Sequence, residues 1–166
     1  MPEIVLLAHN IRSTHNVGSL FRTAEGFGVA KIFISGYTPY PTQQSDTRLP
    51  HIREKLTKQI NKTALGAEAI VPFEYSENVP IERLKQAGYR IVGLEQDARS
   101  QPLVQYKAPE KVALLIGEEV EGIDADLRKL CDDIVEIPMA GRKESFNVSV
   151  AAGIALYQLA LADSSL

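Results

Sequence analysis

The chain has 166 residues, a length typical of one domain and sufficient to bury a sizeable core. Its 45% hydrophobic and 23% charged residues are those of an ordinary globular protein, and no basic and apolar segment at its start indicates secretion. The net charge of −3 argues against a broadly basic, non-specific nucleic-acid binder but permits a local basic patch. Its one cysteine, Cys131, cannot form an internal disulfide, which favours a cytoplasmic location.

Predicted strands and helices alternate along the chain. Apolar runs bounded by turn residues predict strands at 4–8, 31–35, 69–75, 90–94, 112–116 and 133–137. Apolar residues at helical spacing, with capping and breaking residues, predict helices at 16–27, 58–66, 80–87 and 125–130, and a last one from Ser145 or Asn147 to 162. Asn16 is the expected N-cap of the first helix, and residues 36–50 read as a long loop. This order predicts an α/β fold, one domain over 1–166, with a mainly parallel sheet flanked by helices.

The last predicted helix carries no charged residue between Ser145 and Ala162. Surface helices normally carry charges on their outer face, so this helix is expected to be buried against both its own core and a partner subunit. A membrane span is not expected, because the short apolar run is interrupted by Asn147, Ser149, Gly153 and Gln158.

Three loops at the carboxyl ends of predicted strands are candidate sites, since open parallel sheets bind ligands beyond those ends. They follow Leu94, Ile116 and Ile137. Gly117 opens the second loop, where a glycine either serves a tight turn or lets a ligand approach the backbone closely. The acidic residues at 118–121 have no histidine or aspartate at metal-ligand spacing, so no metal site is predicted.

Arg22 lies among apolar residues of the first predicted helix, beside Phe21 and Ala24. Arginine is seldom buried without a partner, so this side chain either extends to water or meets an acid or a phosphate.

Taken together, three segments resemble in order and spacing the motifs of the TrmH group of SPOUT RNA methyltransferases. They are residues 16–24, 114–122 and 137–151, and the resemblance extends from 4 to 159. It implies a C-terminal trefoil knot, although chains in general are not knotted. It also implies a homodimer that binds S-adenosylmethionine and methylates a ribose 2′-hydroxyl of RNA, without a metal.

The resemblance also implies roles for single residues. The implied catalytic residues are Arg22, Asn16, Glu119, Ser145 and Asn147. The implied cofactor-binding residues are Leu94, Gly117, Ile137, Met139 and Ser145. Arginine is effectively always protonated, so clamping an RNA phosphate is physically easier for Arg22 than abstracting a proton.

Among TrmH-type proteins the chain is most similar to the minimal members that methylate tRNA, since neither a separate N-terminal RNA-binding domain nor a basic C-terminal tail is expected. The alternatives are an rRNA methyltransferase, a catalytically silent RNA-binding or assembly protein, and a flavodoxin-like nucleotide binder, which the absence of glycines after the first strand disfavours. The most basic segment, 36–68, is expected to face RNA phosphates with Arg48, His51, Arg53, Lys55, Lys58 and Lys62.

Overall fold

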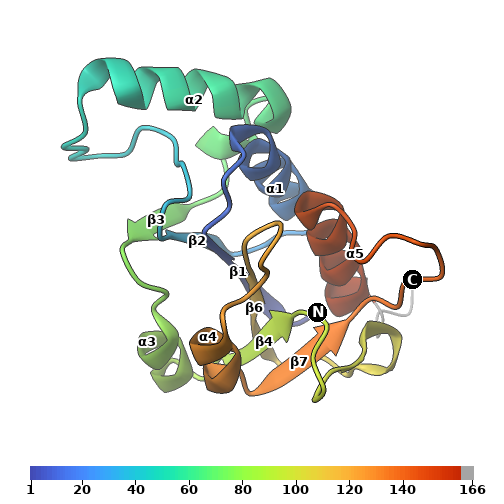
Figure 1. Ribbon diagram of the computed structural model, residues 1–166. Coiled ribbons are helices and arrows are strands. Elements are labelled where there is room, and N and C mark those ends of the chain that lie inside the picture. The colour runs from blue at the N-terminus through green and yellow to red at the C-terminus, as the bar shows by residue number, and fades with distance from the viewer. Residues whose placement is uncertain (162–166) are drawn as a thin grey trace.

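The structure, a computed structural model, describes residues 1–161. Within them one sheet holds seven strands, β1 (Glu3–His9), β2 (Lys31–Ser35), β3 (Phe73–Ser76), β4 (Arg90–Leu94), β5 (Gln101–Pro102), β6 (Lys111–Ile116) and β7 (Asp133–Glu136) (Figure 1). The helices are α1 (Thr14–Gly26), α2 (Pro50–Ala64), α3 (Ile81–Gln86), α4 (Ala125–Leu130) and α5 (Val148–Leu161), with short 3-10 helices η1 (Ala67–Ala69) and η2 (Leu103–Gln105). No helix in residues 1–161 has the length and apolar character that crossing a membrane requires.

The strands lie in the order β3-β2-β1-β6-β4-β7-β5, and every pair of neighbours is parallel. The predicted α/β fold with a mainly parallel sheet is therefore confirmed. Strand β7 is inserted between β4 and β5, which are consecutive in the chain. The trefoil knot stays a prediction from the family resemblance.

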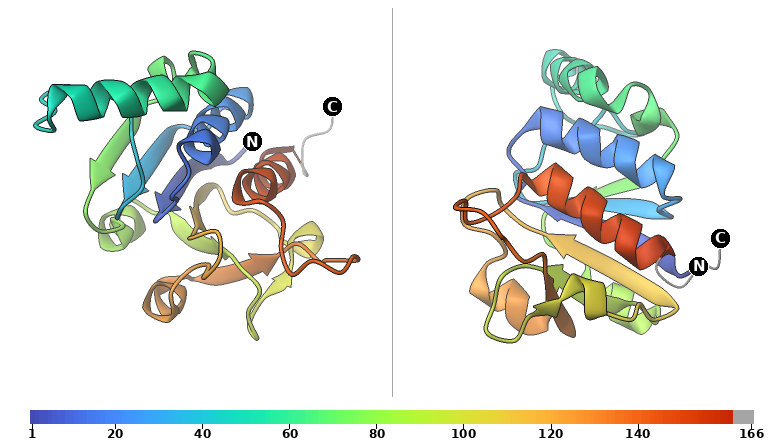
Figure 2. Two further views of the ribbon diagram at one scale, coloured as in Figure 1. Left: turned by 45° about the horizontal axis from the view of Figure 1, so that its top comes forward. Right: turned by 90° about the vertical axis from the view of Figure 1, so that its right-hand side faces the viewer.

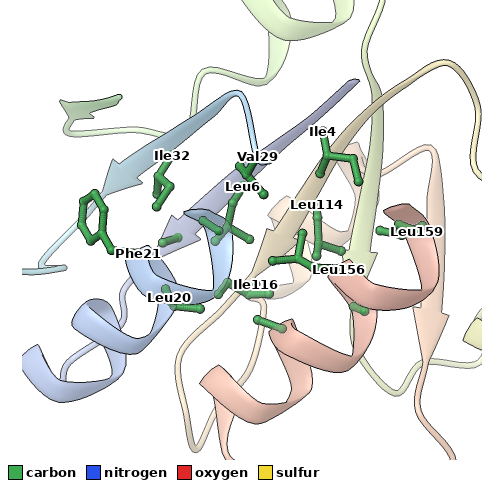
Figure 3. Packing of buried hydrophobic residues seen from close by; sticks show 14 of the residues in the cluster. Ile4, Leu6, Leu20, Phe21, Val29, Ile32, Leu114, Ile116, Leu156 and Leu159 are labelled. Atoms are coloured by element: carbon green, nitrogen blue, oxygen red, sulfur yellow. The ribbon is translucent and has the colours of Figure 1, made fainter. Parts of the chain in front are cut away.

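The sheet is buried on both faces, because helices cover each of them (Figure 2). Helices α1 and α5 pack on one face, against alternate strand residues such as Leu6, Ile32 and Leu114 (Figure 3). The intervening strand residues, such as Leu7 and Leu115, contact α3 on the other face. A shift of one residue in a central strand would exchange the side chains that pack on the two faces, so the fit of each set against its own helices favours one register.

The first and last helices differ slightly from their predicted starts. Ser13, not Asn16, is the N-cap of α1, since its hydroxyl accepts the Asn16 N–H at 3.2 Å. At α5 the choice between Ser145 and Asn147 is decided: the Asn147 Oδ1 accepts the Ser149 N–H at 3.0 Å, which caps the helix. The predicted end at Ala162 lies outside the described residues.

The prediction was least accurate between residues 50 and 76. Helix α2 begins at Pro50 rather than residue 58, because a proline in the first turn has a backbone angle already suited to a helix. The strand predicted at 69–75 was wrong in its first half, which forms η1 and a turn before β3. The two-residue strand β5 and the adjoining η2 were missed, since neither is long enough to show a period.

Helices α1 and α2 approach each other closely at Gly18. A Cβ atom built there would lie 2.1 Å from the Thr63 Oγ1 and 2.3 Å from the Ile60 carbonyl oxygen. The backbone of α2 therefore occupies the space that a side chain would need.

We expect Gly18→Ala to lower the free energy of unfolding by about 1–3 kcal/mol, because the helices must separate to admit a methyl group. Denaturant titration measures this change. Gly26→Ala is the matched control in the same helix, since a Cβ atom at Gly26 meets nothing within 4 Å. Equal stabilities of the two variants would show that α1 and α2 do not depend on this close contact.

Candidate functional site

A cavity of about 240 Å³ opens at the carboxyl ends of β6, β4 and β7. These strands are neighbours in the sheet, so the three candidate loops that follow them converge. The cavity is completed by the segment that precedes α5 and by the first turn of that helix. All five residues expected to bind the cofactor line it: Leu94, Gly117, Ile137, Met139 and Ser145.

The cavity is lined by both apolar and acidic side chains. Side chains such as Ile116, Phe146 and Val148 provide the apolar surface. Six glutamates also line the cavity, and no lysine or arginine of residues 1–161 does: Glu95, Glu118, Glu119, Glu121, Glu136 and Glu144. Of these only Glu119 was expected in the site; Glu136 is the last residue of β7, and the other four lie in segments that follow a strand. Such a lining favours a cationic ligand with an apolar part and disfavours a phosphate group.

Two of these glutamates form hydrogen bonds that connect the loops around the cavity. The Glu95 Oε2 accepts the Ile123 N–H at 2.9 Å, which joins the loop after β4 to the loop after β6. The Glu119 carboxylate accepts the N–H groups of Arg12 and Ser13 at 3.3 and 3.4 Å, which joins the loop after β6 to the start of α1.

Glu119, Asn16 and Asn147 form a hydrogen-bonded chain, although they are distant in sequence. The Asn16 Nδ2 donates to the Glu119 Oε1 at 3.2 Å, and the Asn147 Nδ2 donates to the Asn16 Oδ1 at 3.2 Å. Burial alone would raise the pKa of Glu119. The hydrogen bonds from backbone N–H groups and from Asn16 outweigh burial and hold this pKa below its usual value, so the carboxylate is charged at neutral pH.

Gly117 is required by the loop itself. A Cβ atom there would lie 2.6 Å from the carbonyl carbon and oxygen of Gly122 and from the Ile123 nitrogen. Of the two readings of this glycine, the tight turn is therefore the one that the geometry supports, and the turn places its backbone at the cavity wall.

Arg22 lies apart from the other predicted catalytic residues. It is exposed rather than set in the apolar face of α1, and it forms no hydrogen bond or ion pair with residues 1–161. It is six residues beyond Asn16, about 9 Å along the helix axis, and it does not line the cavity. The Arg22 side chain was expected either to extend to water or to meet an acid or a phosphate, and in the structure it extends to water.

Residues 3–157 match the model of the SpoU rRNA Methylase family. The chain belongs to this family. Among curated SpoU-like relatives, a 23S rRNA (guanosine-2′-O-)-methyltransferase of Pseudomonas putida is 30% identical over 95% of the chain and 58% of that protein. A mouse tRNA (guanosine(18)-2′-O)-methyltransferase is also 30% identical, over 94% of the chain and 9% of its own length. The chain thus spans little more than half of the bacterial relative.

The fold of the chain matches that of a solved SpoU methyltransferase. The chain superposes on the SpoU methyltransferase AviRb from Streptomyces viridochromogenes, solved in complex with AdoMet, with a TM-score of 0.73 and 26% identity. The match covers 96% of the chain and 59% of that protein.

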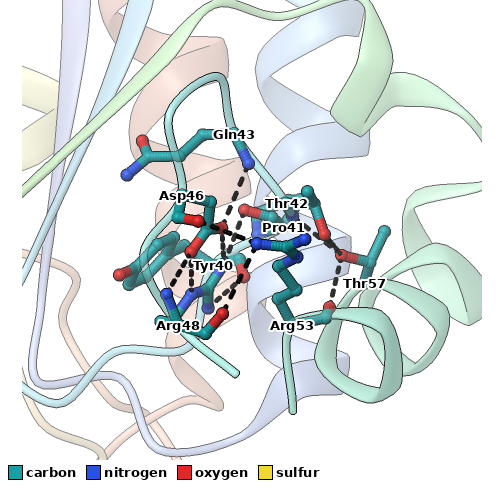
Figure 4. Close-up of polar contacts among 8 residues, drawn as sticks. All are labelled: Tyr40, Pro41, Thr42, Gln43, Asp46, Arg48, Arg53 and Thr57. Carbon is teal, nitrogen blue, oxygen red and sulfur yellow. Dashed lines mark hydrogen bonds and ion pairs between the residues drawn. The ribbon is translucent and has the colours of Figure 1, made fainter. Parts of the chain in front are cut away.

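The basic segment of this SpoU family member is divided between two roles. Arg48 is not free to meet a phosphate: its guanidinium pairs with the Asp46 carboxylate at 2.6 Å and stacks 3.6 Å from the Tyr40 ring centroid (Figure 4). Arg53 donates to the Asp46 carbonyl oxygen at 2.7 Å. Both arginines were expected to face RNA, and instead they hold the loop before α2 in place.

The remaining basic residues of the segment are exposed and share one side of α2. They recur at a spacing of three or four residues, which places them in a row: His51, Lys55, Lys58 and Lys62. None of the lysines forms an ion pair with residues 1–161. This basic row is therefore the part of the segment that remains available for phosphates.

We expect Gly117→Ala to weaken S-adenosylmethionine binding at least tenfold, because the added methyl group displaces the backbone of the loop at 122–123. Isothermal titration calorimetry measures the affinity. Gly141→Ala is the control, since a Cβ atom at Gly141 meets nothing within 4 Å. Unchanged affinity in a folded Gly117→Ala protein would show that this loop does not shape the binding site.

Proposed function

We propose that this protein transfers a methyl group from S-adenosylmethionine to a ribose 2′-hydroxyl of RNA. The observation that carries the proposal is the cavity at the ends of β6, β4 and β7, which is acidic, partly apolar and free of lysine and arginine within the described chain. S-adenosylmethionine is a cation with an apolar and aromatic part, so its chemistry suits this lining. Membership of the SpoU family and the AdoMet complex of AviRb support the same ligand.

The cofactor-binding residues have separable tasks. The loops that begin at Leu94, Gly117 and Ile137 present backbone groups at the ends of three adjacent strands. Apolar side chains, including Met139, exclude water from the cavity. The six glutamates provide the negative potential that attracts a sulfonium. When bound, the cofactor supplies an electrophilic methyl group, whose transfer is an in-line displacement.

The acceptor side of the site is formed by Glu119, Asn16 and Asn147, with Ser145 at the cavity. The hydrogen-bonded chain fixes which end of each amide faces its neighbour, so the polar atoms are oriented before RNA arrives. Such fixed groups accept a hydrogen bond from the ribose hydroxyl and align this hydroxyl with the methyl donor. Arg22 and the basic row on α2 bind phosphates of the RNA, and together they offset the unfavourable net charge.

The two named relatives support different RNA classes. The bacterial relative modifies 23S rRNA, whereas the mouse relative modifies tRNA, which was the first expectation from the sequence. Both relatives act on guanosine ribose, so we propose a ribose 2′-hydroxyl in either RNA class. The cytoplasmic location remains a prediction from the sequence.

We expect Arg22→Ala to abolish methyl transfer while leaving S-adenosylmethionine affinity within about twofold, since Arg22 does not line the cavity. Arg22→Lys recovers little, because an ammonium group cannot reproduce the planar fork that grips a phosphate. The assay measures tritiated methyl incorporation into tRNA and rRNA from a strain lacking the gene, with nuclease resistance as the readout for 2′-O-methylation.

Lys58→Gln, in the basic row, is the comparison in that assay. It raises the KM for RNA and leaves kcat largely intact, because it removes a phosphate contact remote from the reaction. Near wild-type turnover by Arg22→Ala would make this arginine an ordinary surface residue. Binding of RNA without methyl incorporation by the wild-type protein would favour the silent RNA-binding alternative.

We also propose that the protein is a homodimer that associates through α5. The helix exposes an apolar row at Val150, Ile154 and Tyr157, with exposed fractions of 50%, 38% and 58%. Residues at this spacing lie on one side of a helix, and the opposite side packs in the chain's own core. The uncharged sequence of α5 is thus explained by burial on one side and by a partner subunit on the other.

We expect wild-type protein at low micromolar concentration to scatter light with twice the mass of the chain, and Ile154→Glu to give the mass of one chain. A buried, unpaired carboxylate in the interface opposes association. Ile70→Glu, which changes an exposed isoleucine outside α5, is the control and remains dimeric. A monomeric wild-type protein that methylates RNA would refute the dimer but not the activity.

A further inference from the structure

Arg12 and Tyr37 form an exposed pair that the site described above does not use. Arg12 follows β1, and Tyr37 follows β2, the next strand in the sheet. The Arg12 Cζ lies 5.7 Å from the centroid of the Tyr37 ring, and 51% of Tyr37 is exposed. By contrast, the half-buried Arg48 lies 3.6 Å from the Tyr40 ring and pairs with Asp46. The Arg12–Tyr37 pair is looser, and about half of Tyr37 is accessible to a ligand.

The pair lies directly beside the proposed reaction site. The Arg12 N–H donates to the Glu119 carboxylate at 3.3 Å, and Glu119 lines the cavity. The Arg12 side chain therefore extends from a backbone position that contacts the acceptor side of the site. A ligand in contact with Arg12 would be next to a group held by Glu119 and Asn16.

The exposure of Tyr37 is imposed by a rigid turn. The Tyr37 N–H donates to the Asn10 Oδ1 at 3.1 Å. Asn10 and Gly36 both have left-handed backbone angles, φ +56° and +66°, and a Cβ atom at Gly36 would collide with the Asn10 side chain. On the other side of Tyr37, the buried Thr38 hydroxyl accepts the Ile11 N–H at 2.9 Å. The backbone at Tyr37 is thus held from both sides, which fixes the surface position from which its side chain extends.

The charge of Arg12 is also available. It forms no ion pair with any of residues 1–161. The Tyr37 hydroxyl, and then the nearby carboxylates of Glu118 and Glu119, raise the pKa of Arg12, so the guanidinium stays protonated. An exposed aromatic face beside an unpaired guanidinium is the combination that binds an unstacked nucleotide, because every base has a face for stacking and every nucleotide carries a phosphate.

We propose that Tyr37 and Arg12 hold the nucleotide adjacent to the methylated ribose, its base stacked on Tyr37 and its phosphate paired with Arg12. The inference rests on the proposed function. It assigns to the methyl-accepting RNA an unstacked, single-stranded neighbour at the target position. This contact involves both a base and a phosphate, whereas the basic row on α2 contacts phosphates only.

The test compares RNA binding and methyl transfer in three variants, with undermodified tRNA and rRNA as probes. Tyr37→Ala raises the KM for RNA and the dissociation constant from fluorescence anisotropy about tenfold, the loss expected for one base–aromatic stack. Tyr37→Phe restores the aromatic face and with it the affinity. Arg12→Gln weakens binding and reduces its salt dependence, whereas Lys107→Gln, an exposed charge beside β5, does neither. S-adenosylmethionine affinity is the same in all of them.

The outcomes separate this inference from the proposed function. If the wild-type protein methylates RNA and both Tyr37→Ala and Arg12→Gln bind it with unchanged affinity, the nucleotide contact is wrong and the activity stands. If Tyr37→Phe loses as much affinity as Tyr37→Ala, the hydroxyl rather than the ring face binds RNA, and the stacking proposal is overturned. If the wild-type protein binds no S-adenosylmethionine and methylates neither RNA, the proposed function fails first and this inference with it.

Discussion

Every feature of the candidate site depends on the burial of a parallel sheet on both faces. Consecutive residues of β1, β4 and β6 point to opposite faces and pack in two separate apolar clusters, each covered by helices. Because β6, β4 and β7 are neighbours and parallel, their carboxyl ends meet at one edge. Three loops that are separate in sequence are thereby forced together, and the cavity is the space that they enclose.

Glu119 connects this cavity to the rest of the molecule. Its carboxylate is held by backbone groups at the start of α1 and by Asn16, and Asn16 in turn is held by Asn147, which caps α5. One acid therefore couples the loop after β6 to the first turns of both helices that cover the same face of the sheet. Such fixed orientation lowers the reorganisation that a reaction would otherwise require.

The distribution of charge reconciles an acidic chain with the proposed RNA substrate. Negative charge is concentrated in the six glutamates at the cavity, where a cationic ligand benefits from it. Positive charge is exposed elsewhere, in the basic row on α2, at Arg22 and at Arg12. Arg48 and Arg53 are both held by contacts within the loop before α2. Residue type alone therefore does not identify the cations that are available to RNA.

The sequence alone determined the class of fold, most of the strands and the three loops at strand ends, because apolar periodicity and the positions of glycine and proline are local signals. The five residues expected at the cavity wall came from the resemblance to TrmH-type proteins. From the lack of charge in α5 the sequence also predicted burial on a second side, where the structure of the single chain exposes Val150, Ile154 and Tyr157. Only the tertiary structure decided which polar groups meet. Asn16 was predicted as the cap of α1 and, from the resemblance, as a catalytic residue; Ser13 is the cap, and Asn16 donates to Glu119. Arg22 was predicted in an apolar face and is exposed. These facts depend on helix rotation and on contacts across more than a hundred residues, such as that between Asn16 and Asn147, and no local pattern records either of them.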